Sequence, residues 1–272
     1  NVKGEQMKID GESFYKISNV NGMRPFFMSI VSHSNHWMFI SSTGALSAGR
    51  KDSDAALFPY YTDDKISDSF ETTGSKSIFL VEKNGQTFLW EPFSLRQASL
   101  YKISQNLYKN AFGNKVIFEE INHDLEIRFT YEWNSTDRYG FVRKSSLYNT
   151  ANSAVKVQFI DGIQNVLPYG VEEALQNGTS NLVDAYKRTE LVEGSSLAIF
   201  ALSAIIVDKA EPSEALKSNI TWSIGLENPT ILLSSLQLDA FRRGQEVSQE
   251  TDVKAEKGAY FLHSEVALES NG

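Results

Sequence analysis

The sequence contains no cysteine among its 272 residues. This absence excludes structural disulfides, thiolate metal sites and cysteine nucleophiles. No apolar run approaches the roughly 18–20 residues that a membrane-spanning helix needs, because the best one, SSLAIFALSAIIVD (195–208), has only the length of a long buried strand. No basic and then apolar signal peptide opens the chain. We therefore expect a cytoplasmic protein without a membrane partner.

Positive charge is also scarce. The chain has 26 Lys and Arg against 34 Asp and Glu, which gives a net charge of −8 and a pI near 5.1. Binding to nucleic acid requires a concentrated basic surface, and the nearest basic cluster, Arg242-Arg243, has an acidic segment just downstream. We therefore expect no nucleic-acid partner.

Strand signals dominate what is present. Alternating or aromatic and β-branched runs are bounded by turn residues, and Asn84-Gly85 predicts a two-residue hairpin because both residues tolerate positive φ. A second hairpin is predicted at 114–133, turning at 122–124, and a third pair at 139–168, turning at 149–154. The other predicted strands lie at 13–19, 24–32, 36–41, 189–208, 218–241 and 260–269.

One stretch, residues 170–188, favours a helix. Glu172 and Glu173 lie early in it and Lys187 and Arg188 late, which suits the helix dipole, and Asn177-Gly178 is expected to split it. About a dozen strands with few helices predict an all-β fold. We expect residues 1–272 to form a single domain, a large antiparallel β-sandwich with a few short helices.

Catalytic and metal-binding patterns are weak. His33 and His36 are three apart, and on a strand this spacing directs them to opposite faces, so neither a metal site nor another cofactor is predicted. His263 and Glu265 share one face of a predicted strand, which leaves an aldose epimerase of the mutarotase kind as an alternative. The adjacent carboxylate pairs Asp63-Asp64, Glu119-Glu120 and Glu172-Glu173 are interpreted as solvated charge. We predict no catalytic residue in this chain.

The strongest candidate for a contact site is the segment 44–65. It combines charges with Leu57, Phe58, Tyr60 and Tyr61, and exposed apolar clusters mark contact surfaces. Either it contacts a ligand or partner, or it is a loop satisfied by its own salt bridges. Three of the four tryptophans are expected to be buried. The candidate carbohydrate or interface contacts are Arg50, Lys51, Asp52, Tyr60 and Tyr61.

The order of the hairpins carries a family resemblance. SIVSHSNHWMF (29–39), a charged loop and IFLVEKNGQTFLWEPF (78–93) come first, and the hairpins from residue 114 follow. This order resembles the N-terminal β-sandwich domain of the cellobiose/chitobiose phosphorylase family, which is glycosyltransferase family 36-like and glycoside hydrolase family 94-like. The segments that carry the resemblance are Phe88–Pro92, Leu125–Trp133 and Asn149–Phe159, within residues 24–210.

The resemblance implies a supersandwich of the galactose-mutarotase kind. In that family the catalytic acid lies in a separate (α/α)6 barrel further along the chain, and loops of the β-domain reach the active-site mouth and a dimer interface. We therefore expect a non-catalytic β-domain of a glycoside phosphorylase or hydrolase, cut from a longer protein. Its expected partners are carbohydrate, the downstream catalytic domain and a second copy in a homodimer. A free-standing carbohydrate-binding module is the alternative.

Overall fold

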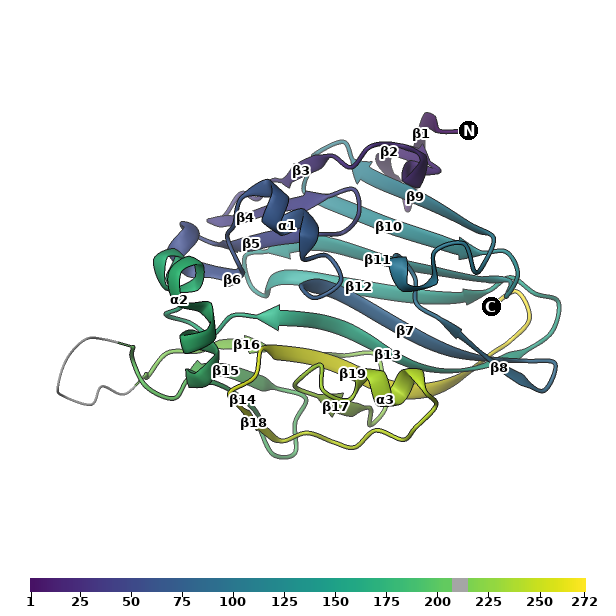
Figure 1. Cartoon of the computed structure of the whole chain (residues 1–272). Coiled ribbons are helices and arrows are strands. Elements are labelled where there is room, and N and C mark those ends of the chain that lie inside the picture. The colour runs from purple at the N-terminus through teal and green to yellow at the C-terminus, as the bar shows by residue number, and fades with distance from the viewer. Residues whose placement is uncertain (207–214) are drawn as a thin grey trace. The chain divides into compact units, whose positions relative to one another are not determined.

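The computed structural model describes residues 1–206 and 215–272, and these residues form an all-β protein with few helices (Figure 1). The helices are α1 (Asp63–Asp68), α2 (Glu173–Tyr186) and α3 (Leu238–Arg242), with 3-10 turns η1 (Val20–Gly22), η2 (Ser53–Ala55) and η3 (Leu95–Gln97). None of the helices in the described part of the chain is long and apolar enough to cross a membrane.

The strands fall into four sheets. The six-stranded sheet has the order β1 (Lys3–Ile9), β2 (Glu12–Ser18), β9 (Ile103–Asn110), β10 (Lys115–Asn122), β11 (Ile127–Thr136) and β12 (Gly140–Asn149). The five-stranded sheet has the order β17 (Thr230–Leu232), β19 (Gly258–Leu268), β13 (Val155–Val166), β7 (Gly74–Lys83) and β8 (Gln86–Trp90). The first four-stranded sheet is β16 (Asn219–Thr221), β15 (Ala198–Leu202), β14 (Lys187–Leu191) and β18 (Asp252–Lys254), and the second is β3 (Phe27–Ile30), β4 (His36–Ser41), β5 (Leu46–Arg50) and β6 (Ala56–Phe58).

The chain divides into two compact units. Unit 1 comprises residues 1–46, 79–157 and 265–272, and unit 2 comprises residues 47–78 and 158–264.

The core of unit 1 lies on one face of the six-stranded sheet. Phe118 on β10 pairs with Tyr131 on β11, and their rings stack at 4.8 Å. Phe93 packs edge-on against both rings, at 6.2 Å from Phe118 and 5.4 Å from Tyr131. Side chains alternate between the faces of a strand, so the even-numbered residues of β10 line the core. Full burial of one such ring stabilises the fold by roughly 1.5–3 kcal/mol.

Local turn chemistry explains the first two predicted hairpins, and both predictions are confirmed. Asn84 and Gly85 have φ values of 53° and 75°, which are the positive values of a two-residue hairpin turn. On its two sides, Phe79–Lys83 pair with Gln86–Trp90. The second hairpin joins β10 to β11.

The third predicted pair is wrong as a hairpin, because β12 and β13 lie in different sheets. Asn149, at the end of β12, explains the separation. Its Nδ2 donates to the carbonyl oxygens of Ser153 (2.7 Å), Leu268 (3.4 Å) and Glu269 (3.0 Å), and its Oδ1 accepts from the Ala151 amide. The turn therefore bonds to a distant segment of the chain instead of closing two strands on each other.

Unit 2 contains the predicted helix. α2 is interrupted at Thr179, where φ is −141° and ψ is 41°, so the expected split next to Asn177-Gly178 is confirmed. The segment 189–208 contributes β14 and β15, which pair as antiparallel strands; residues 207 and 208 lie outside the described residues.

The prediction of strand throughout 218–241 is wrong. Only β16 and β17 are extended there, and α3 follows them. Glu250 explains part of this, because its carboxylate accepts from the Leu233 amide, the Ser234 hydroxyl and the Gln237 side chain. These bonds hold residues 233–237 out of a strand ladder.

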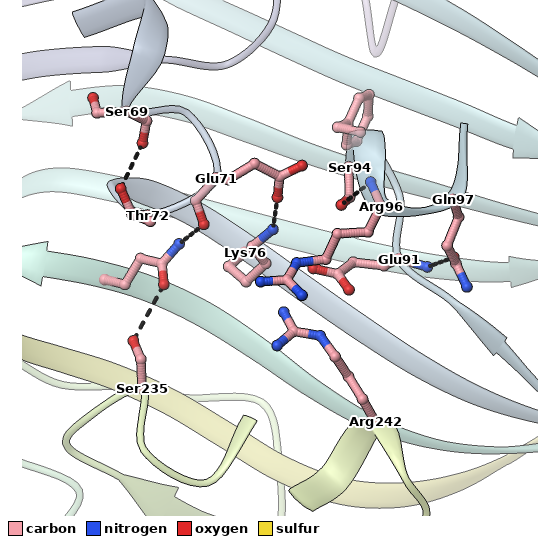
Figure 2. A network of polar contacts seen from close by, with 12 residues as sticks. Ser69, Glu71, Thr72, Lys76, Glu91, Ser94, Arg96, Gln97, Ser235 and Arg242 are labelled. Carbon is pink, nitrogen blue, oxygen red and sulfur yellow. Dashed lines mark hydrogen bonds and ion pairs between the residues drawn. The ribbon is translucent and has the colours of Figure 1, made fainter. Parts of the chain in front are cut away.

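A buried lysine is satisfied inside unit 2. Lys76 on β7 is 6% exposed and donates to Glu71 at 2.5 Å, and Figure 2 shows Glu71 directed at it from the turn before the strand. Gln164 donates to the Glu71 carbonyl oxygen at 2.8 Å and accepts from the Ser235 hydroxyl at 3.2 Å. Strands β7 and β13 are thereby tied to this turn.

Strands β13 and β19 approach closely where β13 carries Gly162. A Cβ atom built on Gly162 would lie 2.0 Å from the Tyr260 carbonyl oxygen. Backbone atoms cannot rotate away, so only glycine fits here.

Candidate functional site

The segment 44–65 is not a loop but two strands and the start of a helix, joined by an anchored turn. In unit 2 the Asp54 carboxylate accepts from the Glu173 amide at 3.0 Å, at the positive end of α2, where the helix dipole favours a negative charge. The Leu167 amide donates to the Leu57 carbonyl oxygen at 2.8 Å. These contacts fix the β5–β6 turn from both ends.

Arg50, Lys51 and Asp52 lie together in the chain at the end of β5, and all three are exposed. Lys51 has φ of 65°, in the left-handed region that non-glycine residues seldom adopt. Such local strain persists only where the surrounding structure imposes it, and it concentrates at functional sites.

The two tyrosines of the segment have different environments. Tyr60 is 37% exposed. The Tyr61 hydroxyl accepts from Gln176 Nε2 at 2.8 Å, and Lys65 lies 5.3 Å from the centre of its ring. Tyr61 therefore fastens the segment to α2, whereas the Tyr60 side chain is partly exposed to solvent.

The prediction of an exposed apolar cluster in segment 44–65 is wrong. Phe58 is only 2% exposed and Pro59 is buried, because β6 directs Phe58 into the core of unit 2. Leu57 is half-buried, so the exposed apolar surface of the segment is reduced to Tyr60.

The histidines have structural partners. His33 is exposed and pairs with Asp137 at 2.7 Å. His36 is buried, bonds to the Ser34 hydroxyl at 2.9 Å and packs against Phe141. Within the described ranges, no three His, Asp or Glu side chains gather closely enough to hold a metal ion.

The residues of the epimerase alternative also have partners. His263 packs edge-on against Phe241 at 5.4 Å between ring centres. In the other unit, Glu265 pairs with Lys156 at 3.0 Å. These partners favour a structural role for both residues.

Two tryptophans rather than three are buried. Trp90 and Trp133 are 1% and 2% exposed, Trp37 is half-buried, and Trp222 is 44% exposed. Trp222 follows β16, the outer strand of its sheet, and alternates with Ile220 and Ile224, which are also exposed.

The interpretation of Glu119-Glu120 as solvated charge is wrong, because they are 6% and 2% exposed. Adjacent residues of a strand face opposite sides, so each carboxylate has its own partners. Glu120 accepts from Trp90 Nε1 at 2.9 Å, the Phe93 amide at 2.7 Å and Gln105 Nε2 at 2.8 Å. Burial raises the pKa of Glu120 above its usual value, and the three hydrogen bonds oppose that rise.

Glu119 belongs to a second cluster, on the other face of the sheet. Its Oε1 accepts from Asn106 Nδ2 and from the Tyr108 hydroxyl, both at 2.7 Å. Burial, followed by the bond to Glu119, raises the pKa of Tyr108. Arg128 Nη1 lies 3.7 Å from Glu119 Oε2, and Arg128 Cζ lies 4.2 Å from the centre of the Tyr148 ring.

A polar pocket of about 170 Å³ adjoins this cluster in unit 1. Its walls come from β11, from the end of β12 with the following turn, and from the C-terminal segment. The lining residues are Arg128, Tyr148, Asn149, Thr150, Asn271 and Gly272.

Sequence reasoning missed this pocket, although part of the signal was present. The hairpin at 114–133 was predicted, and in its observed register Glu119 pairs with Thr130, which makes Arg128 a diagonal neighbour of Glu119 across the strands. The pairing of Arg128 with Tyr148 depends on β11 and β12 being neighbours. The contribution of residues 271–272 is non-local and has no sequence signal.

No protein-family model matches the chain, and no curated protein matches it in sequence. The family resemblance therefore stays a prediction. Segment 44–65 and the pocket beside Arg128 both offer hydrogen-bond donors and aromatic rings, which are features of binding sites.

Proposed function

We propose that the chain is the non-catalytic N-terminal β-domain of a glycoside phosphorylase or glycoside hydrolase. It shapes a carbohydrate site and contacts a downstream (α/α)6 catalytic domain or a second subunit. The proposed architecture is the antiparallel supersandwich of the galactose-mutarotase kind, supported by the all-β content and the confirmed hairpins. The observation that carries the proposal is the anchored segment 50–61, in which Arg50 and Tyr60 are exposed.

A rigid turn suits a contact role, because a group that is already ordered loses less entropy when it binds. Asp54 and Tyr61 supply that rigidity through α2. Arg50 offers a planar fork of donors for carboxylates or sugar hydroxyls. Tyr60 offers an aromatic ring against which the C–H face of a sugar can pack.

The alternative, a free-standing carbohydrate-binding module, is favoured by one observation. The polar pocket beside Arg128 is lined by residues of unit 1.

The test uses the longer polypeptide that includes the downstream domain. Arg50→Ala and Tyr60→Ala should each lower kcat/KM for disaccharide phosphorolysis or hydrolysis by about tenfold or more, equivalent to about 1.4 kcal/mol. Their melting temperatures should match that of the parent protein, since both side chains are exposed. Asp63→Ala, an exposed change on α1, is the control and should leave both quantities unchanged. Full activity in both variants would contradict the proposal.

A further inference from the structure

Arg128 is a half-buried cation whose side chain makes no hydrogen bond to any of the described residues, 1–206 and 215–272. Its side chain is 39% exposed, and its closest carboxylate oxygen, on Glu119, is 3.7 Å away, too far for a hydrogen bond. Its Nε atom is buried and meets no acceptor among the described residues. A ligand cannot reach the covered Nε, but the Nη atoms of the 39% exposed side chain are donors that an acceptor from outside the protein can reach.

The guanidinium is nevertheless held in place. The Tyr148 ring lies on one side of it, with Cζ at 4.2 Å from the ring centre, and the Glu119 carboxylate attracts it from another direction. A donor fixed in this way needs little reorganisation when an acceptor arrives. Arg128 is therefore pre-organised for binding at the pocket it lines.

The charge balance favours a neutral ligand over an anion. Glu119 is 6% exposed, and Arg128 is the cation beside it. An anionic ligand would share the Arg128 guanidinium with a buried carboxylate, and the two like charges would repel at short range. A hydroxyl oxygen can accept from the guanidinium without this repulsion.

The other residues that line the pocket can form hydrogen bonds with the hydroxyl groups of a ligand. The Tyr148 phenol, the Thr150 hydroxyl and the Asn271 amide can each donate and accept hydrogen bonds. Asn149 is occupied by the fold, because its amide bonds to the turn and to the C-terminal segment. The pocket volume is about 170 Å³, and the occupant considered is a single ring.

We propose that this pocket binds a single neutral sugar ring, at a subsite separate from the β5–β6 turn. The inference rests on the proposed function for the class of ligand, and on Arg128 and its neighbours for the place and the charge. Arg128 donates to ring hydroxyls, and Thr150 and Tyr148 complete the hydrogen bonding.

The experiment is a nuclear magnetic resonance titration of the isotope-labelled chain 1–272, in which the Arg128 Nε–Hε signal is observed directly. The probes are D-glucose and N-acetyl-D-glucosamine, followed by D-glucuronate and inorganic phosphate. We expect saturable shifts of the Arg128 signal and of amides at 148–150 and 271–272 with a neutral sugar, at millimolar dissociation constants. Thr150→Ala and Tyr148→Phe should each weaken binding at least about threefold.

Arg138→Met is the matched control, because Arg138 also lies over a tyrosine ring, 5.2 Å from the centre of Tyr139, outside the pocket. It should leave binding unchanged. The proposal would be overturned if neither neutral sugar gave a saturable shift. It would also be overturned if neither Thr150→Ala nor Tyr148→Phe changed the dissociation constant. Tighter binding of glucuronate or phosphate than of the neutral sugars would overturn the conclusion that the ligand is neutral. None of these outcomes depends on Arg50 or Tyr60, so the proposed function stands or falls separately.

Discussion

Replacing Glu120 tests whether a buried carboxylate organises the core of unit 1. In Glu120→Ala, the donors on Trp90 and the Phe93 amide lose their acceptor inside the protein, while half-buried Gln105 can turn to water. An unsatisfied buried donor costs about 1–3 kcal/mol, so two of them cost roughly 2–6 kcal/mol. Removal of a buried charge offsets part of this loss. We expect a net loss of about 2–4 kcal/mol in the free energy of unfolding.

Glu120→Gln keeps the volume and one acceptor oxygen. The amide oxygen can serve Phe93 and Gln105 where Oε2 does so now, which leaves only the Trp90 donor without an acceptor. The expected loss is about 1–3 kcal/mol before the relief from removing a buried charge. Urea unfolding followed by the total tryptophan fluorescence measures both variants.

The free-energy cost of Glu120→Gln should change with pH in a definite direction. Burial raises the pKa of Glu120, so the folded chain holds the proton at pH values where the unfolded chain has lost it. This stabilising contribution is complete below the unfolded pKa near 4.5 and is lost as pH rises through the folded pKa. Because glutamine does not titrate, the cost of Glu120→Gln should shrink as pH rises from 4.5 towards neutrality. A cost that grows over this range would refute the reasoning, since the hydrogen bonds would then outweigh burial.

Two further changes test unit 2. Gly162→Ala places a Cβ against the Tyr260 carbonyl oxygen and should lower the free energy of unfolding by about 1–3 kcal/mol. The control is Gly178→Ala, whose Cβ meets nothing within 4 Å and should cause no such loss. Equal melting temperatures for the two variants would show that β13 and β19 can separate freely. Asp54→Ala removes the acceptor of the Glu173 amide and should cost about 0.5–2 kcal/mol, with faster hydrogen exchange at residue 173, and Asp54→Asn should retain most of the protection. Unchanged exchange in Asp54→Ala would mean that the turn is held without this carboxylate.

Short-range signals predicted much of the fold. Asn84-Gly85 specified its hairpin because positive φ at two successive residues leaves few other turns. The kink in α2 beside Asn177-Gly178 was predictable for another local reason, because glycine weakens a helix interior. The separation of β12 from β13 into different sheets was not, because Asn149 bonds to residues about 120 positions away.

Which side chains are buried was harder to predict from the sequence than the hairpins were. Glu119 and Glu120 are charged, and sequence alone favours exposing them, yet Asn106, Tyr108, Trp90 and Gln105 satisfy them inside the fold. These partners come from other strands and a register that no local pattern specifies. Phe58 illustrates the opposite case, since its place among charges indicated exposure although its strand directs it inward.

The most direct test of the central claim compares the purified chain 1–272 with the longer polypeptide that contains the downstream domain. The measurement is release of sugar or sugar phosphate from disaccharides, with and without inorganic phosphate. The account predicts no release by the chain alone and release by the longer polypeptide. Turnover by residues 1–272 alone would contradict the claim that this β-domain is non-catalytic.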